Sequence, residues 1–154
     1  MISLYEELRA IVQILNEADI PHALVGGLAY SLWVETRATE DIDLLIMRED
    51  WDRIPEMLEP LGYLSLAAPM DFSNVSIRRL TKIEERSALV VDFLLADSEP
   101  LKEGIARARK IEYMGRVFSV ASPETIILLK EGRMSSKDKN DIEGLRKLRE
   151  GADR

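Results

Sequence analysis

The sequence predicts one α+β domain in which helices and strands are interspersed along 154 residues. Three observations favour it. Apolar residues recur at helical spacing near the N-terminus, short β-rich apolar runs fill the middle, and Ser122-Pro123-Glu124 begins a C-terminal helix. Apolar residues make up 46% and charged residues 32% of the chain, the balance of an ordinary globular protein. We expect a core at about residues 20–121 and a helical part at about 122–150.

The N-terminal third is predicted to contain a strand, a glycine turn and a helix, flanked by an amphipathic helix and a second strand. Apolar residues recur every three or four positions between Leu4 and Leu15. The next apolar run ends at Gly26-Gly27, which is typical of a buried strand that turns into a helix. The expected elements are a helix that begins near Leu4 and stops near Asp19-Ile20-Pro21, a strand at Ala23–Val25, a helix at Leu28–Val34 and a strand at Asp41–Met47.

The rest of the chain is predicted to alternate strands with helices. One helix ends at Gly62 and is capped by Asp50 or Asp52, of which Asp52 leaves Pro55 in the first turn. The other expected elements are strands at Tyr63–Ala67, Val75–Leu80 and Ala88–Leu95, a loop at Ala68–Asn74, a charged hairpin tip at Lys82–Ser87, a helix at Ser98–Ala108, a hairpin about Met114-Gly115, a helix from Ser122 to Gly132, and a last helix from Ser135 or Ser136 through Leu148.

Composition excludes several kinds of site. The chain has no cysteine and one histidine, His22, so disulfides, thiolate zinc sites, cysteine nucleophiles and two-histidine zinc motifs are ruled out. The net charge of −7 argues against a broad duplex-binding surface, which needs clustered cations. No apolar run reaches the ~20 residues of a membrane span, and the N-terminus lacks a cationic signal segment, so we expect a cytoplasmic protein.

Three aspartates carry the chemical prediction. Asp41 and Asp43 open a strand at positions i and i+2, so their side chains point to the same face. Asp92 is the only charge inside another apolar strand. If the two strands are neighbours, the three carboxylates converge and require cations. Oxygen ligands without thiolates or clustered imidazoles favour Mg²⁺ or Mn²⁺.

The glycine pair complements these carboxylates. Gly26 and Gly27 lack a Cβ, so a ligand can approach their amide groups, and the helix that follows presents its positive end to a phosphate. Carboxylates that bind metal and a glycine turn that binds phosphate are the parts of a phosphoryl-transfer site, with Asp92 polarising the acceptor hydroxyl.

In this order, Val25-Gly26-Gly27, Asp41-Ile42-Asp43 and Asp92 resemble the pattern of the DNA polymerase beta-like nucleotidyltransferase superfamily. Two further segments resemble the abortive-infection type and related minimal bacterial members of this superfamily. The first is the segment before Asp41, with Arg37 and Thr39. The second is the C-terminal motif, with Ser122-Pro123-Glu124, Lys130, Arg133, Lys137, Asp138 and Asp141.

The resemblance implies a small mixed sheet flanked by helices. It also implies that Asp41, Asp43 and Asp92 are metal ligands and catalytic residues. The implied nucleotide-binding residues are Gly26, Gly27, Arg37, Thr39 and Lys130.

We therefore expect a magnesium-dependent enzyme that moves a nucleoside monophosphate from an NTP to a hydroxyl and releases pyrophosphate. The resemblance implies a partner-protein side chain, as in toxin–antitoxin pairs, an RNA 3′ end or a small antibiotic as acceptor, and a partner chain or homodimer. The alternative is a non-catalytic module that retains the fold and acts through nucleotide or protein contacts.

Several of these residues also have a purely structural interpretation, which the sequence leaves open. Asp92 can be a charge that protects an edge strand, and Lys130 can pair with an aspartate of the last helix. Arg78 and Arg79 alternate faces, so at most one of them can point at the site, and a solvated position is the simpler expectation. His22 is expected either at the surface or at the entry to a strand.

Overall fold

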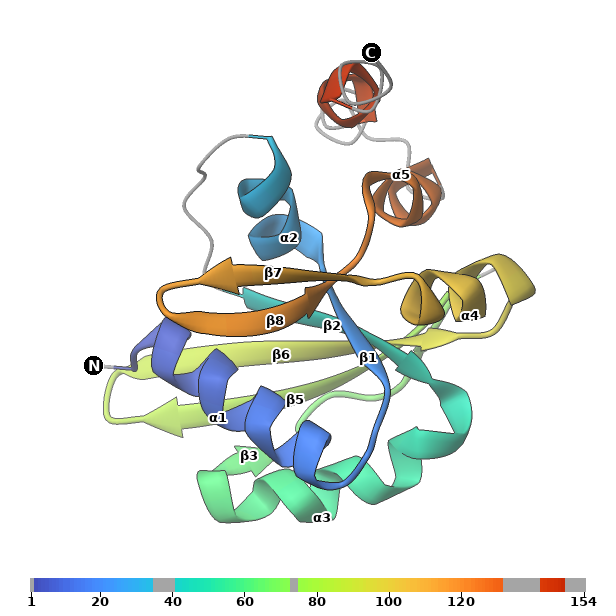
Figure 1. Cartoon of the computed structure of the whole chain (residues 1–154). Coiled ribbons are helices and arrows are strands. Elements are labelled where there is room, and N and C mark those ends of the chain that lie inside the picture. The colour runs from blue at the N-terminus through green and yellow to red at the C-terminus, as the bar shows by residue number, and fades with distance from the viewer. Residues whose placement is uncertain (1, 35–40, 73–74, 132–141, 149–154) are drawn as a thin grey trace.

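A computed structural model describes residues 2–34, 41–72, 75–131 and 142–148. Within them, eight strands form one mixed sheet in the order β3-β5-β6-β2-β1-β8-β7, with β4 paired to β5 (Figure 1). The strands are β1 (His22–Val25), β2 (Asp41–Met47), β3 (Tyr63–Leu64), β4 (Met70–Asp71), β5 (Ser76–Glu84), β6 (Ser87–Ala96), β7 (Arg109–Tyr113) and β8 (Arg116–Val120). The β2–β6 and β1–β8 pairs are parallel and the others antiparallel. The predicted α+β class is confirmed.

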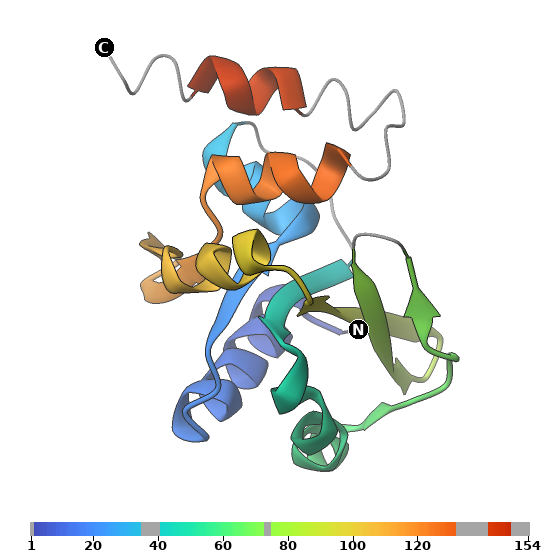
Figure 2. The same ribbon diagram turned by 90° about the vertical axis from the view of Figure 1, so that its right-hand side faces the viewer.

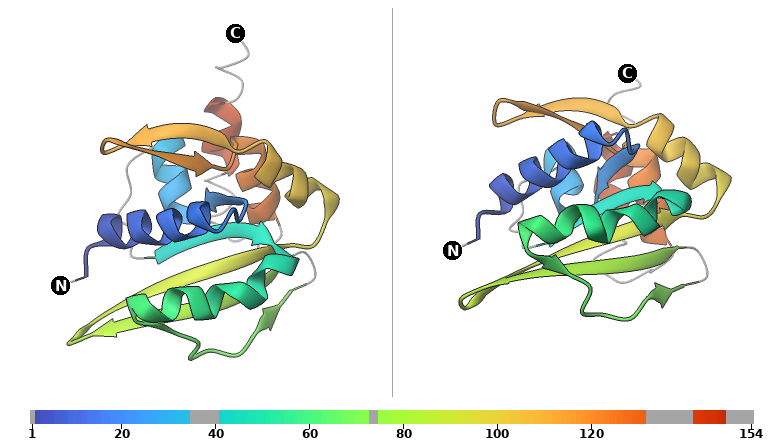
Figure 3. Two further views of the ribbon diagram at one scale, coloured as in Figure 1. Left: turned by 60° about the horizontal axis from the view of Figure 1, so that its bottom comes forward. Right: turned by 90° about the horizontal axis from the view of Figure 1, so that it is seen from below.

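Helices cover both faces of the sheet. α1 and α3 lie together on one face, while α2 and α5 lie on the other (Figures 2 and 3). Within the described residues, no helix is long and apolar enough to cross a membrane. The helices are α1 (Leu4–Glu17), α2 (Gly26–Trp33), α3 (Ile54–Leu58), α4 (Glu99–Ala106) and α5 (Pro123–Glu131), with a further helical segment at 142–148.

The apolar pattern of β2 decides which face its aspartates take. Ile42, Leu44 and Ile46 are fully buried, and each such side chain contributes about 1.5–3 kcal/mol relative to an exposed one. A shift of one residue in the pairing would move these side chains to the other face and bury the carboxylates of Asp41 and Asp43. The core therefore holds both aspartates on the opposite face.

The β5–β6 hairpin is longer than predicted. The strands pair as far as Glu84 and Ser87, so the tip is only Glu85-Arg86 instead of the whole predicted segment from Lys82. Glu85 takes the left-handed conformation (φ 53°) that such a tight turn requires. The charged side chains do not end the strands, because a strand tolerates charge where it faces solvent.

Three further predictions, about β3, the loop after it and the start of α3, were wrong. β3 stops at Leu64, and the predicted loop at Ala68–Asn74 contains β4, which pairs with β5. Neither Asp50 nor Asp52 caps α3, because the chain enters that helix through a 3-10 turn at Arg48–Arg53.

His22 is buried, with 6% of its surface exposed, so a surface position is excluded and the alternative, entry to a strand, is the correct one. It begins β1 and its Nδ1 donates a hydrogen bond to the Ile20 carbonyl over 3.0 Å. Nε2 has no partner among the described residues. Burial lowers the pKa of His22, because the charged imidazolium is poorly solvated there.

This burial predicts an acid-sensitive fold. Unfolded chains bind the His22 proton near pH 6.5 and the folded protein only at lower pH, so stability is complete above pH 6.5 and falls below it. The slope for one proton is at most about 1.4 kcal/mol per pH unit. Urea unfolding between pH 7.5 and 5.5 should show a smaller loss of stability in His22→Leu than in the wild type. Equal losses would contradict this assignment.

Candidate active site

Two of the three predicted carboxylates lie in one row across the sheet. Asp43 on β2 is the direct register partner of Asp92 on β6, and β2 and β6 are adjacent parallel strands. Adjacent strands lie about 4.8 Å apart, and register partners point to the same face. Asp92 is central in the sheet and only 8% exposed, which overturns its interpretation as an edge-strand charge. The structure thus brings together two carboxylates that are distant in sequence.

Asp41 and Asp43 share a face of β2, and this is the face on which α2 and α5 lie. The opposite face of β6 carries Phe93, whose ring lies 5.6 Å from that of Trp51 just before α3. Asp92 precedes Phe93 and therefore points away from α3. Asp41 is exposed and Asp43 half-buried, so the carboxylates become more accessible toward the start of β2.

The backbone of Gly26 lies directly against the side chain of Asp43. It has a positive φ of 71° and begins α2 immediately after β1, whose last residue, Val25, pairs with Asp43. A Cβ on Gly26 would lie 2.7 Å from Asp43 Cγ and 2.9 Å from its Cβ, and would overlap Oδ2. Glycine is therefore required here both for its conformation and for its lack of a side chain.

Arg79 is a member of this site that the sequence interpretation missed. It is the β5 register partner of Asp92. Its Nε and Nη2 donate hydrogen bonds to Asp92 Oδ1 (2.8 Å) and Oδ2 (3.0 Å). The hydrogen bond with Asp92 raises the pKa of Arg79, and the charges of Asp41 and Asp43 raise it further. Arg79 thus lies in the field of all three carboxylates.

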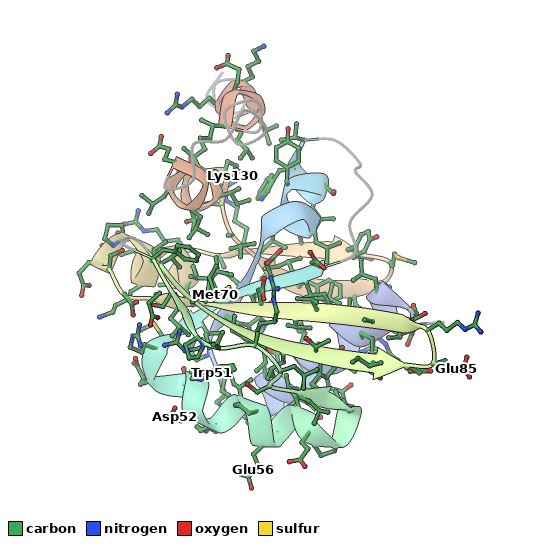
Figure 4. All side chains as sticks on the ribbon, turned by 180° about the vertical axis from the view of Figure 1, so that it is seen from behind. Trp51, Asp52, Glu56, Met70, Glu85 and Lys130 are labelled. Carbon is green, nitrogen blue, oxygen red and sulfur yellow. The ribbon has the colours of Figure 1, made fainter. Side chains whose placement is uncertain are left out.

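Lys130 is buried on α5 and is 4% exposed. Its ammonium lies 5.7 Å from the centre of the Tyr30 ring of α2. Figure 4 places Lys130 above the sheet, whereas Trp51 and the α3 region lie below it. Lys130 therefore occupies the side of the sheet toward which Asp92 points, and its contact with phosphate stays a prediction.

Several of the predicted site residues lie outside the described part of the chain. Arg37 and Thr39 lie outside the described residues, as do Asp138 and Asp141, the expected partners of Lys130. Gly27 follows Gly26 in the first turn of α2, where its carbonyl accepts a hydrogen bond from the Ser31 hydroxyl over 2.9 Å.

The donor chemistry of this site fits a hard cation. Its ligands are carboxylate oxygens, and the chain has no cysteine. Both oxygens of Asp92 are turned to Arg79. Among the residues that the structure describes, no group of three or more Asp, Glu, His or Cys side chains is arranged to hold a metal ion.

Comparison with known families gives one match, to a family described as "uncharacterised nucleotidyltransferase", over residues 1–139. The match includes the glycine turn, all three aspartates and Arg79. No curated protein matches the chain in sequence.

Solved structures share the fold. The lincomycin-bound lincosamide antibiotic adenylyltransferase LnuA is 17% identical with a TM-score of 0.58, covering 93% of this chain and 96% of LnuA. A structure described as a putative nucleotidyltransferase from Thermotoga maritima is 14% identical with a TM-score of 0.58, covering 97% and 92%. ANT(2″)-Ia in complex with adenylyl-2″-tobramycin is 21% identical with a TM-score of 0.56, covering 93% and 86%.

Proposed function

This chain belongs to the nucleotidyltransferase family that matches residues 1–139, and from this membership we propose that it transfers a nucleoside monophosphate from an NTP to a hydroxyl group. The reaction forms a bond between the acceptor oxygen and the α-phosphorus. It breaks the bond from the α-phosphorus to the oxygen that leads to the β-phosphate, and pyrophosphate leaves. The hydroxyl proton passes to a carboxylate, for which we propose Asp92.

The register of the carboxylates carries this proposal. Asp43 and Asp92 are direct partners on adjacent strands, and Asp41 lies on the same face two residues before Asp43. Two like charges repel by about 4 kcal/mol at 4 Å in a partly screened site, so neighbouring carboxylates favour a bound cation. Arg79 supplies one positive charge at Asp92, and we propose that a divalent ion supplies more.

We propose that Asp41, Asp43 and Asp92 hold Mg²⁺ or Mn²⁺. A divalent ion bound there neutralises charge on the phosphates and activates the attacking oxygen. The protein's own part is to fix the carboxylates. β2 is held by its buried apolar face, β6 by pairing on both sides, and Asp43 by its contact with Gly26.

The triphosphate is proposed to bind at the start of α2. Gly26 and Gly27 begin α2, and the amide groups of the first turn of a helix have no partner within the helix. Val25, the residue before α2, makes no side-chain cap, so these amides are not satisfied that way. Further proposed phosphate contacts are Arg37, Thr39 and Lys130.

A small polar antibiotic is the acceptor class that we propose first. Two proteins of similar fold and length support this proposal. LnuA is a lincosamide antibiotic adenylyltransferase, and the ANT(2″)-Ia complex contains adenylyl-2″-tobramycin. A net charge of −7 also attracts a cationic acceptor such as an aminoglycoside. An RNA 3′ end and a protein hydroxyl are the other acceptors to test.

The test is acceptor-dependent pyrophosphate release. Purified protein is incubated with each of the four NTPs and Mg²⁺, together with lincomycin, tobramycin, a short RNA or a cell extract. We expect release that needs one acceptor and that stops when EDTA removes the metal. Transfer of α-phosphate label to the acceptor identifies the product.

Binding of nucleotide without turnover would favour the non-catalytic module instead. Calorimetric titration with ATP and GTP, with and without Mg²⁺, separates the two outcomes. If binding is independent of Mg²⁺ and no acceptor in the panel gives product, the proposed transfer is wrong.

A further inference from the structure

We propose that Arg79 is a positioning residue that competes with the divalent cation for the Asp92 carboxylate. This inference rests on the proposed function, because it assigns Arg79 a role at the same three aspartates. Its starting point is the two-point pair in which Nε and Nη2 of Arg79 bind both oxygens of Asp92, at 2.8 and 3.0 Å.

The pair occupies the atoms that a metal would use. A carboxylate presents two oxygens, and here each of them accepts a hydrogen bond from the same guanidinium. The Asp92 side chain is 12% exposed, so water cannot readily take the place of Arg79. A cation that binds Asp92 must therefore displace at least one of these two hydrogen bonds.

The position of Arg79 allows it to release the Asp92 carboxylate. Its side chain is 38% exposed, which means that the guanidinium reaches Asp92 from the solvent side of β5. The charges of Asp41 and Asp43 also act on it, so it partly neutralises the whole cluster. Arg79 thereby compensates the charge of Asp92 when no metal is bound, and it weakens metal binding at that carboxylate in return.

Arg78 provides a matched control on the same strand. It points to the opposite face of β5, since consecutive strand residues alternate, and it pairs with the exposed Asp71 at 2.9 Å. Arg78→Gln removes the same charge from the neighbouring position without touching Asp92. Any effect of net charge alone will appear in both variants.

The experiment measures Mn²⁺ binding without nucleotide, by titration calorimetry and by loss of the free-ion electron paramagnetic resonance signal. We expect Arg79→Gln to bind Mn²⁺ at least about tenfold more tightly than the wild type, because one competing positive charge is gone. Arg78→Gln should stay within about threefold of the wild type, since its charge acts from the opposite face. With EDTA, Arg79→Gln should have a lower Tm than Arg78→Gln, and Mn²⁺ should raise its Tm more.

Arg79→Lys keeps the inference testable if Arg79→Gln does not fold. Lysine retains the charge but cannot hold both oxygens in the planar two-point geometry, so its Mn²⁺ affinity should lie between those of the wild type and Arg79→Gln. A lysine variant that binds Mn²⁺ no better than the wild type, in the absence of a folded glutamine variant, would overturn the inference.

The outcomes separate this inference from the proposed function. If the wild type and Arg79→Gln bind Mn²⁺ with equal affinity and Asp43→Asn does not bind it, the role of Arg79 is overturned. The proposed metal site is then still supported. Weaker binding of Mg²⁺–NTP in Arg79→Gln with unchanged Mn²⁺ affinity makes Arg79 a phosphate contact and also overturns it. If no variant binds Mn²⁺, the inference about Arg79 fails, while acceptor-dependent pyrophosphate release still tests the proposed function.

Discussion

Replacing Asp43 by asparagine is expected to lower kcat/KM for nucleotidyl transfer at least about 10³-fold, since each factor of ten corresponds to ~1.4 kcal/mol and metal assistance contributes several kcal/mol. Asp43 is the central carboxylate of the site. It is the register partner of Asp92, it lies two residues after Asp41, and it contacts Gly26. Asparagine keeps its size and loses only its charge, so the fold should persist while cation binding is lost.

A carboxylate outside the site supplies the control. Asp71 on β4 is exposed and pairs with Arg78, on the face of β5 opposite to Arg79. Asp71→Asn removes one negative charge, as Asp43→Asn does, and should retain activity within about threefold because an exposed ion pair contributes little. Acceptor-dependent pyrophosphate release measures both variants, and Mn²⁺ titration checks the metal step. An Asp43→Asn protein as active as Asp71→Asn would remove Asp43 from the proposed mechanism.

The carboxylate strands could be predicted because their signals are local. Asp41–Met47 alternates over a fully buried face, and the strand around Asp92 is a continuous apolar run, so both were predicted close to their observed bounds. The helix start at Ser122-Pro123 is equally local, and Ser122 does accept a hydrogen bond from the Thr125 amide. Membership of the nucleotidyltransferase family also followed from such local motifs and is confirmed.

The part that could not be predicted depends on register and on tertiary packing. Arg78 and Arg79 are equivalent in sequence, and only the pairing of β5 with β6 places Arg79 beside Asp92 and Arg78 on the other face. His22 gives no local signal of burial, because its burial comes from strand pairing on both sides of β1. The short β4 forms on a neighbouring strand and has no apolar period of its own.

Gly26→Ala is the second substitution with a large expected effect, about 10²-fold on kcat/KM, because displacement of a catalytic group by about 1 Å is enough for such a loss. Two costs are combined at this position. A φ of 71° is unfavourable for alanine by about 1–2 kcal/mol. In addition, the new methyl group would overlap Oδ2 of Asp43, so the carboxylate must move away from the row it shares with Asp92.

Gly115→Ala separates these two costs. Gly115 lies in the turn between β7 and β8 with a φ of 81°, and a Cβ there would meet no atom within 4 Å. In urea titrations Gly115→Ala should lose about 1–2 kcal/mol of the free energy of unfolding, from the backbone conformation alone, and Gly26→Ala should lose more because the overlap with Asp43 is added. Only Gly26→Ala should also lose activity and Mn²⁺ affinity, because only its methyl group displaces a carboxylate. If the two variants turn over at the same rate, the contact between Gly26 and Asp43 serves the fold alone.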